Sequence, residues 1–116
     1  MTINSQSAVA RIIEELEHKG GLRGIDIANI TDVSKATVSR WRNGSAKPQP
    51  SNELIISDLR YIVLRLQEYY NVDEIRVWLH SRHPQLEGAR AIDLIHSHKT
   101  DEVLQVLNRL DAGAYL

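Results

Sequence analysis

Hydrophobic residues recur along this chain at the spacing of helix faces, and no segment alternates in the way a β-strand does. A first stripe predicts an amphipathic helix from about Ser5 to Lys19, which Gly20 and Gly21 end. The stripe consists of Val9, Ile12, Ile13 and Leu16.

A longer stripe follows the prolines at positions 48 and 50, which stop any helix from running through them. It predicts a helix from Ser51 or Asn52 to about Tyr70, with Ile55, Leu59, Ile62, Val63 and Leu66 in register. A second apolar set lies beyond this stripe and consists of Leu54, Ile56, Tyr61 and Leu64. Two interpretations remain open: a second copy of the chain covers this surplus in a homodimer, or the chain wraps its own central helix.

Between these helices, the segment from Ile25 to Gly44 is typical of two short helices joined by a tight turn at residues 31–33. Ile25 and Ala28 are spaced to share one face of the first helix. Ser34 is a good N-cap for the second helix, which runs from about Lys35 to Asn43 and stops at Gly44. This is the pattern of a helix-turn-helix, and it indicates DNA binding.

In the second of these helices Val38 and Trp41 lie three residues apart and are expected to point inward. Residues 33–52 contain four basic residues and no acidic one, which favours a nucleic-acid surface over an ordinary αα-hairpin with a solvated basic face. The predicted DNA-contacting residues are Ser34, Lys35, Ala36, Thr37, Ser39, Arg40, Arg42, Asn43 and Lys47.

The segment resembles the Xre-type helix-turn-helix of phage repressors and bacterial antitoxins. The matching residues are Ala28, Val33, Ser34, Thr37, Val38, Ser39 and Gly44. Asp32 stands where that pattern has a glycine in the turn, and aspartate is one of the few other residues that tolerate the left-handed conformation.

Three shorter helices are predicted over residues 73–81, 91–96 and 100–111, with a turn-rich loop from Arg82 to Arg90. The predicted fold class is therefore all-α. We divide the chain into a helix-turn-helix bundle with its long connecting helix, residues 1–70, and a small helical domain, residues 71–116.

Composition narrows the function classes. The 116 residues have a net charge of −1, which is the balance of +2 over residues 1–50 and −3 over residues 51–116. The chain has no cysteine and no apolar run long enough to span a membrane, so we expect a cytoplasmic protein with no membrane partner. The histidine pairs at 80 and 83 and at 96 and 98 lack companion ligands, so we expect no metal and no cofactor. Because no local nucleophile motif is present, we do not expect an enzyme. Both tryptophans are interpreted as core anchors, because both fall on the apolar side of their helices.

The last third of the chain resembles the C-terminal toxin-binding domain shared by the Xre, MbcA and ParS antitoxins. Four motifs carry the resemblance: Val77-Trp78-Leu79, Pro84-x-Leu86-x-Gly88, Ile92-Asp93-Leu94-Ile95, and a final helix closing on Gly113-x-Tyr115. Ala91 departs from the family, which usually has a proline there to start the short helix.

This resemblance implies a dimeric antitoxin of a type II toxin–antitoxin system that neutralises a toxin and represses its own operon by binding operator DNA. The toxins of such systems commonly have the RES fold and destroy NAD⁺. The implied toxin-binding residues are Gly113, Ala114, Tyr115 and Leu116, with Arg82 and Arg90. Two alternatives are a toxin-neutralising module without DNA binding and a stand-alone repressor; the latter is disfavoured because about 45 residues are too few for an ordinary enclosed ligand pocket.

Overall fold

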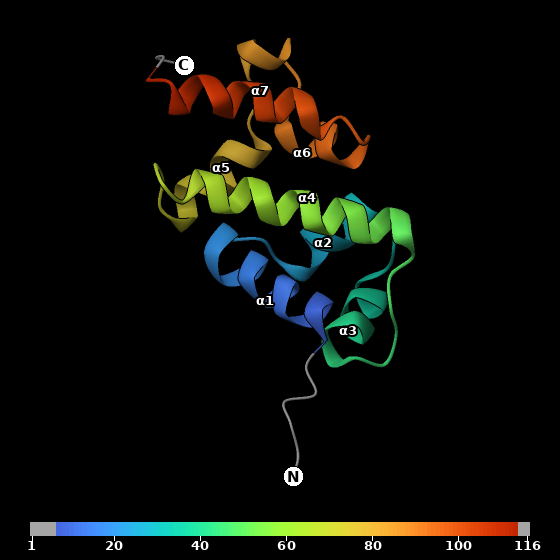
Figure 1. Ribbon diagram of the computed structural model, residues 1–116. Coiled ribbons are helices and arrows are strands. Elements are labelled where there is room, and N and C mark those ends of the chain that lie inside the picture. The colour runs from blue at the N-terminus through green and yellow to red at the C-terminus, as the bar shows by residue number, and fades with distance from the viewer. Residues whose placement is uncertain (1–6, 114–116) are drawn as a thin grey trace.

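The computed structural model describes residues 7–113, and in this range it contains seven α-helices, one 3₁₀ turn and no strand (Figure 1). The all-α fold class predicted from the sequence is confirmed. The elements are α1 (Ala8–Gly20), α2 (Gly24–Thr31), α3 (Lys35–Asn43), α4 (Pro50–Leu66), α5 (Val72–His80), the turn η1 (Pro84–Leu86), α6 (Ala91–His96) and α7 (Thr100–Asp111).

Helix ends follow local capping chemistry. The predicted bounds of α3, α6 and α7 are confirmed, whereas α4 ends at Leu66 and not near Tyr70. Tyr69 and Tyr70 both donate their backbone N–H groups to the Leu66 carbonyl, which turns the chain out of the helix. α5 then begins with a capping box in which Asn71 Oδ1 and the Glu74 N–H, and Glu74 Oε1 and the Asn71 N–H, each lie 2.9 Å apart.

The long helix α4 lies across the middle of the molecule, with α1 on one side and α6 and α7 on the other (Figure 1). Its buried side chains contact both layers, and Leu59, Ile62 and Leu66 have no exposed surface. One continuous core joins the two parts of the chain that we separated near residue 70. It includes Ile13 and Leu16 of α1, Trp41 of α3, Ile75 and Leu79 of α5, Ile95 of α6 and Val103 and Leu107 of α7.

The second apolar set on α4 divides between the two interpretations that the sequence left open. Ile56 is only 1% exposed, because the chain's own helices cover α4 on two sides and not along one stripe. Ile25 is 43% exposed, since the inward face of α2 is made by Ile27, Ile30 and Ala28. Leu54 and Tyr61 do remain exposed on α4, at 52% and 49%.

Candidate functional site

The outer face of α3 is held by a chain of side-chain hydrogen bonds. The Ser34 hydroxyl caps the helix by accepting the Thr37 N–H at 3.1 Å, and the hydroxyl oxygens of these two residues lie 3.0 Å apart. Arg40 donates from Nη2 to the Thr37 hydroxyl at 3.1 Å. The guanidinium of Arg40 is therefore fixed along an exposed helix face, and Gly44, in the left-handed conformation, ends the helix.

Val38 and Trp41 are buried at 1% and 3% exposure, as expected for the inward anchors of α3. The predicted contact residues are exposed with two exceptions, the half-buried Thr37 and Arg42. The exposed ones are Ser34, Lys35, Ala36, Ser39, Arg40, Asn43 and Lys47. Arg42 instead turns toward α1, where its guanidinium donates to the carboxylate of Glu17, so it lies off the common face.

The turn between α2 and α3 has the backbone conformation inferred from the sequence. Asp32 has φ 57° and ψ 41°, in the left-handed region, and the Val33 N–H donates to the Ala28 carbonyl at 3.0 Å. The Asp32 carboxylate is not confined to the turn. Its Oδ2 lies 2.8 Å from Nε2 of His96, at the end of α6, so the turn touches the C-terminal part of the chain.

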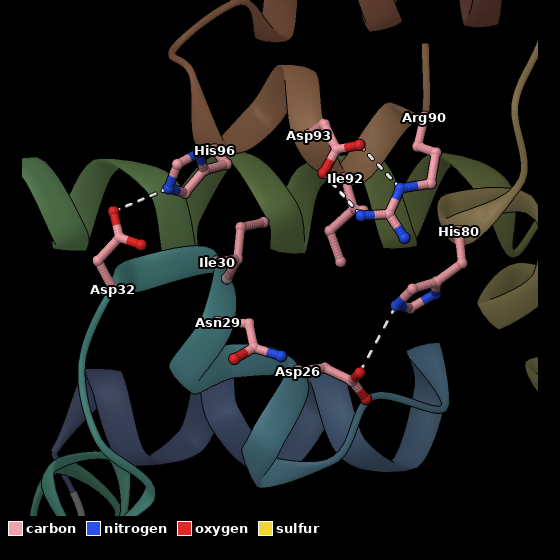
Figure 2. Close-up of a pocket in the computed structure, with 9 residues that line it drawn as sticks. All are labelled: Asp26, Asn29, Ile30, Asp32, His80, Arg90, Ile92, Asp93 and His96. Carbon is pink, nitrogen blue, oxygen red and sulfur yellow. Dashed lines mark hydrogen bonds and ion pairs between the residues drawn. The ribbon is translucent and has the colours of Figure 1, made fainter. Parts of the chain in front are cut away.

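A cleft of about 260 Å³ lies between α2 and the C-terminal helices, and Figure 2 shows the side chains around it. On one flank Asp26 of α2 accepts from Arg76 Nη1 at 2.6 Å and from its own helix cap, the Arg23 N–H, at 2.8 Å. His80 Nε2 approaches the other carboxylate oxygen of Asp26 at 3.5 Å. Burial by itself would raise the pKa of Asp26, but the hydrogen bonds from Arg76 and Arg23 outweigh it and hold that pKa below its ordinary value.

Every carboxylate that lines this cleft already has a partner. Asp26 has Arg76, Asp93 has Arg90, and Asp32 has His96. Over residues 7–113 no group of His, Cys, Asp or Glu side chains is arranged to hold a metal ion. Two of these pairs bridge α2 and its C-cap to the helices α5 and α6, and the third, Asp93 with Arg90, lies at the start of α6.

The two arginines predicted to contact a toxin lie at the ends of the loop between α5 and α6, where Arg82 and Arg90 form an isolated antiparallel bridge. Arg82 Nη1 donates to the Gly88 carbonyl at 3.0 Å, within the same loop. Arg90 makes a two-pronged contact with Asp93, at 2.8 and 2.9 Å, and this contact lowers the pKa of the Asp93 carboxyl group. Both guanidinium groups thus shape the loop.

The C-terminal end of α7 is fastened to α4 by a polar cluster that the sequence did not reveal. The Asp111 carboxylate accepts from the Tyr69 hydroxyl and from Arg65, and these bonds lower the pKa of Asp111. Arg65 also donates to Asn108 Oδ1 at 3.1 Å and to the Tyr61 hydroxyl at 3.2 Å. Gly113 follows with a left-handed φ of 83°. The predicted contact residues Ala114, Tyr115 and Leu116 lie outside the described residues.

Trp78 is not the fully buried anchor that its spacing suggested. Its ring is half-buried, and it packs against the His83 ring with the two centroids 4.5 Å apart. Together with Tyr70, these two rings line two adjoining hollows of about 380 and 340 Å³ on the outside of α5. We call this surface the α5 groove.

The sequence of this chain is similar to those of known proteins. Residues 65–113 match the family described as the antitoxin Xre/MbcA/ParS C-terminal toxin-binding domain. A probable mycobacterial cidal antitoxin of Mycobacterium tuberculosis is 27% identical over 116 residues, covering 100% of this chain and 98% of the relative. The mycobacterial cidal antitoxin MbcA of Mycobacterium bovis is 29% identical over 110 residues, covering 95% of this chain and 94% of the relative.

The fold has a counterpart among solved structures. A chain in the crystal structure of the M. tuberculosis MbcT–MbcA toxin–antitoxin complex superposes with a TM-score of 0.83 at 25% identity, over 95% of this chain and 99% of that chain. Over nearly its whole length the all-helical chain is therefore similar to antitoxins of toxin–antitoxin systems. Residues 65–113 are an Xre/MbcA/ParS C-terminal toxin-binding domain, and the chain as a whole is homologous to the MbcA antitoxins.

Proposed function

We propose that this protein neutralises a cognate toxin by occluding the toxin's active site, and that it represses its own operon by binding operator DNA through α3. The proposed toxin binding rests on the match of residues 65–113 to a toxin-binding domain, in a chain that superposes on one chain of a toxin–antitoxin complex. The proposed partner is a RES-type toxin that degrades NAD⁺, and the proposed compartment is the cytoplasm. The described residues contain no helix with the length and apolar character needed to cross a bilayer.

The proposed contact with the toxin's active site is the segment Gly113 to Leu116. The end of α7, from which this segment leaves, is held in place, because the Asp111 side chain is bonded to Arg65 and Tyr69 of the neighbouring α4 region. Gly113, in the left-handed conformation, follows the helix. A segment that leaves a fixed point loses less conformational freedom when it binds than one that leaves a frayed helix. An aromatic and an aliphatic side chain at positions 115 and 116 suit an apolar part of an active-site cleft.

The DNA arm rests on the exposed face of α3. Lys35 and Arg40 supply positive charge there, with Lys47 in the loop that follows, and Arg40 is held in place by Thr37. A helix of this kind enters the major groove with its short polar and basic side chains toward the bases. We leave Arg42 out of this surface because Glu17 holds it against α1. The companion proposal is a homodimer formed through the exposed part of α4, where Leu54 and Tyr61 lie seven residues apart and therefore on one face.

The toxin arm is tested by co-expression with the protein encoded by the reading frame next to this gene. We expect the full chain to restore growth of cells that express that neighbour, and deletion of residues 113–116 to abolish the rescue while leaving helical content unchanged. Growth arrest that persists with the full chain present would refute the toxin arm. Full rescue by the shortened chain would instead show that residues 113–116 are not the occluding segment.

The DNA arm is tested by footprinting the purified chain on its own promoter. We expect protection of a palindrome with half-sites about 10 bp apart, or a multiple of that spacing. No protection at low salt would favour the second candidate function, a toxin-neutralising module whose α2–α3 pair does not bind DNA.

A further inference from the structure

We propose that the α5 groove is a docking surface for the cognate toxin, separate from the segment that enters its active site. The occupant is a segment of the toxin that presents an apolar side chain with basic neighbours. This inference rests on the proposed neutralising function.

The apolar side chains on the outside of α5 are not explained by the fold. The helix contributes Ile75 and Leu79 to the core, and neither has exposed surface. Val77, by contrast, is 63% exposed, the highest value among the large hydrophobic residues over positions 7–113, and it lines the first hollow beside Tyr70 and Trp78. β-Branched residues lower helix propensity slightly, so an exposed valine gives this helix no local advantage. A solvent-facing apolar patch of this kind marks an interaction site.

The floor of the groove is rigid. Trp78 and His83 pack ring against ring, and the Nε2 atom of His83 lies 2.7 Å from the Trp78 carbonyl oxygen. The His83 N–H also donates to the Ala89 carbonyl at 3.1 Å, which anchors the histidine to its loop. Tyr70 completes the set of rings shared by the two hollows. Aromatic side chains that are fixed before binding make strong anchors because little rotamer entropy remains to be lost.

The charged residues at the rim of the groove indicate the charge that its occupant should carry. Asp73 and Glu74 line the first hollow, and no Lys or Arg does so. The whole of residues 65–113 has six Lys or Arg and eight Asp or Glu, a net charge of −2. Acidic groups around an apolar floor attract a partner with Lys or Arg beside an apolar residue, and they repel a second copy of this domain.

The position of the α5 groove also suits contact with the toxin. It lies wholly within the matched toxin-binding domain, and Tyr70 on its floor adjoins Tyr69, whose hydroxyl donates to Asp111 at the end of α7. In Figure 1, α5 and the end of α7 lie toward the left of the view, whereas α3 lies at the lower right. A single toxin can therefore cover the groove and receive the segment after Gly113, while α3 stays accessible.

The test uses the full chain and the purified product of the neighbouring reading frame as the probe, with binding measured by calorimetry. Val77→Glu should weaken binding at least about tenfold, because it places a charge where an apolar side chain docks. Ile25→Glu is the matched control, since Ile25 is an exposed apolar residue on α2, outside the matched domain. We expect it to bind the probe as the unmodified chain does. Both variants should keep the helical content of the unmodified chain.

A second experiment uses the unmodified chain and therefore needs no substitution in the groove. In hydrogen exchange of the unmodified chain, addition of the probe should protect backbone amides over residues 72–83. If Val77→Glu binds the probe with unchanged affinity, or if residues 72–83 gain no protection, the inference is wrong. The proposed function still stands in either case, provided that the unmodified chain binds the probe. No binding by the unmodified chain overturns the proposed function itself. If Val77→Glu converts a dimer into a monomer, the groove is an interface between copies and the inference is wrong.

Discussion

Asp32 and His96 are 64 residues apart in the sequence, yet Oδ2 of the aspartate lies 2.8 Å from Nε2 of the histidine. The contact joins the turn before α3 to the last residue of α6. At the other end of α2, Asp26 is bonded to Arg76 of α5. Both ends of α2 are thus tied to the toxin-binding domain, so α3 is held in a fixed orientation relative to that domain.

The left-handed backbone at Asp32 leads to a first prediction. Asp32→Gly should change the free energy of unfolding by less than about 1 kcal/mol, because glycine adopts this conformation freely and the lost bond to His96 is exposed to solvent. Asp32→Val should cost about 1 to 3 kcal/mol, since a β-branched residue is strained at φ 57°. Urea unfolding of the two variants measures the difference. Equal stabilities would show that the turn does not require this conformation.

A second prediction concerns acid. The folded-state pKa of Asp26 is held below its ordinary value by Arg76 and Arg23, against the opposing effect of burial. A lowered folded-state pKa gives stability that is present above the unfolded-state pKa of about 3.9 and is lost as the pH falls through the folded-state value. Asp26→Asn should therefore be less stable than the parent at pH 7, by about 1 to 3 kcal/mol.

Asp26→Asn should also make the free energy of unfolding less dependent on pH in the acid range. Asp93, Asp111 and Glu15 also have lowered pKa values, but they act alike in the parent and the variant. The difference between the two curves therefore isolates Asp26. Urea titrations from pH 7 to pH 2 provide the measurement, and a gap that stays constant below pH 4 would contradict the assignment.

The continuous core predicts a single unfolding transition. The chain has two tryptophans, Trp41 in α3 and Trp78 in α5, so Trp41→Phe and Trp78→Phe each leave one reporter, before or after α4 in the sequence. In both variants the fluorescence and circular dichroism curves should coincide. Leu59→Ala, in the middle of α4, should lower both midpoints together and cost about 2 to 5 kcal/mol. Transitions that separate between the two reporters would show two independent folding units.

Arg40 and Arg42 form a matched pair for the proposed DNA surface. Arg40→Ala should weaken operator binding by about 1 to 3 kcal/mol if its guanidinium contacts a guanine. Arg42→Ala should have a smaller effect, because its guanidinium is engaged by Glu17. Anisotropy titrations with a labelled promoter fragment compare the two. Three basic groups per copy give a dimer about six phosphate contacts and a salt slope of about −5, whereas counting Arg42 would give about −7.

The exposed part of α4 predicts the state of assembly. Tyr61→Glu, at the exposed position, or Leu64→Glu, at the half-buried position three residues on, should convert a homodimer into a monomer with unchanged helical content, because a charge would be buried against the second copy. Ile25→Glu serves as the control, since Ile25 is equally apolar and exposed but lies on α2. Analytical ultracentrifugation reads out the result. A monomeric parent protein at high concentration would rule out this interface.

Local signals in the sequence were sufficient for the helices. The cap at Ser34, the stop at Gly44 and the 3.6-residue stripes identified most elements, because capping and amphipathic spacing act within a few residues. The left-handed conformation of Asp32 was expected from the resemblance, because the Xre-type pattern has a glycine at that position. The family resemblance, which rested on spaced motifs around Trp78, Leu86 and Gly113, is confirmed by the match over residues 65–113.

Contacts between distant segments could not be predicted. Nothing in the spacing of Arg42 or Asp111 indicates that Glu17 or Tyr69 will lie beside it, since these pairs form only when helices pack. The burial of Ile56 has the same origin. A stripe analysis assumes one buried side, and α4 is buried on two.

The match to the toxin-binding domain begins at residue 65, inside α4, and not at the loop that follows it. The segment that matches the family therefore begins in the middle of the helix that both halves of the core share. A chimera that joins the α1–α3 region of one relative to residues 65–113 of another would have to repack both sides of α4 at once. If α3 reads the operator and the α5 groove docks the toxin, as proposed, new pairings of the two specificities should arise through substitutions on the exposed faces of α3 and α5, and seldom by exchange of whole segments.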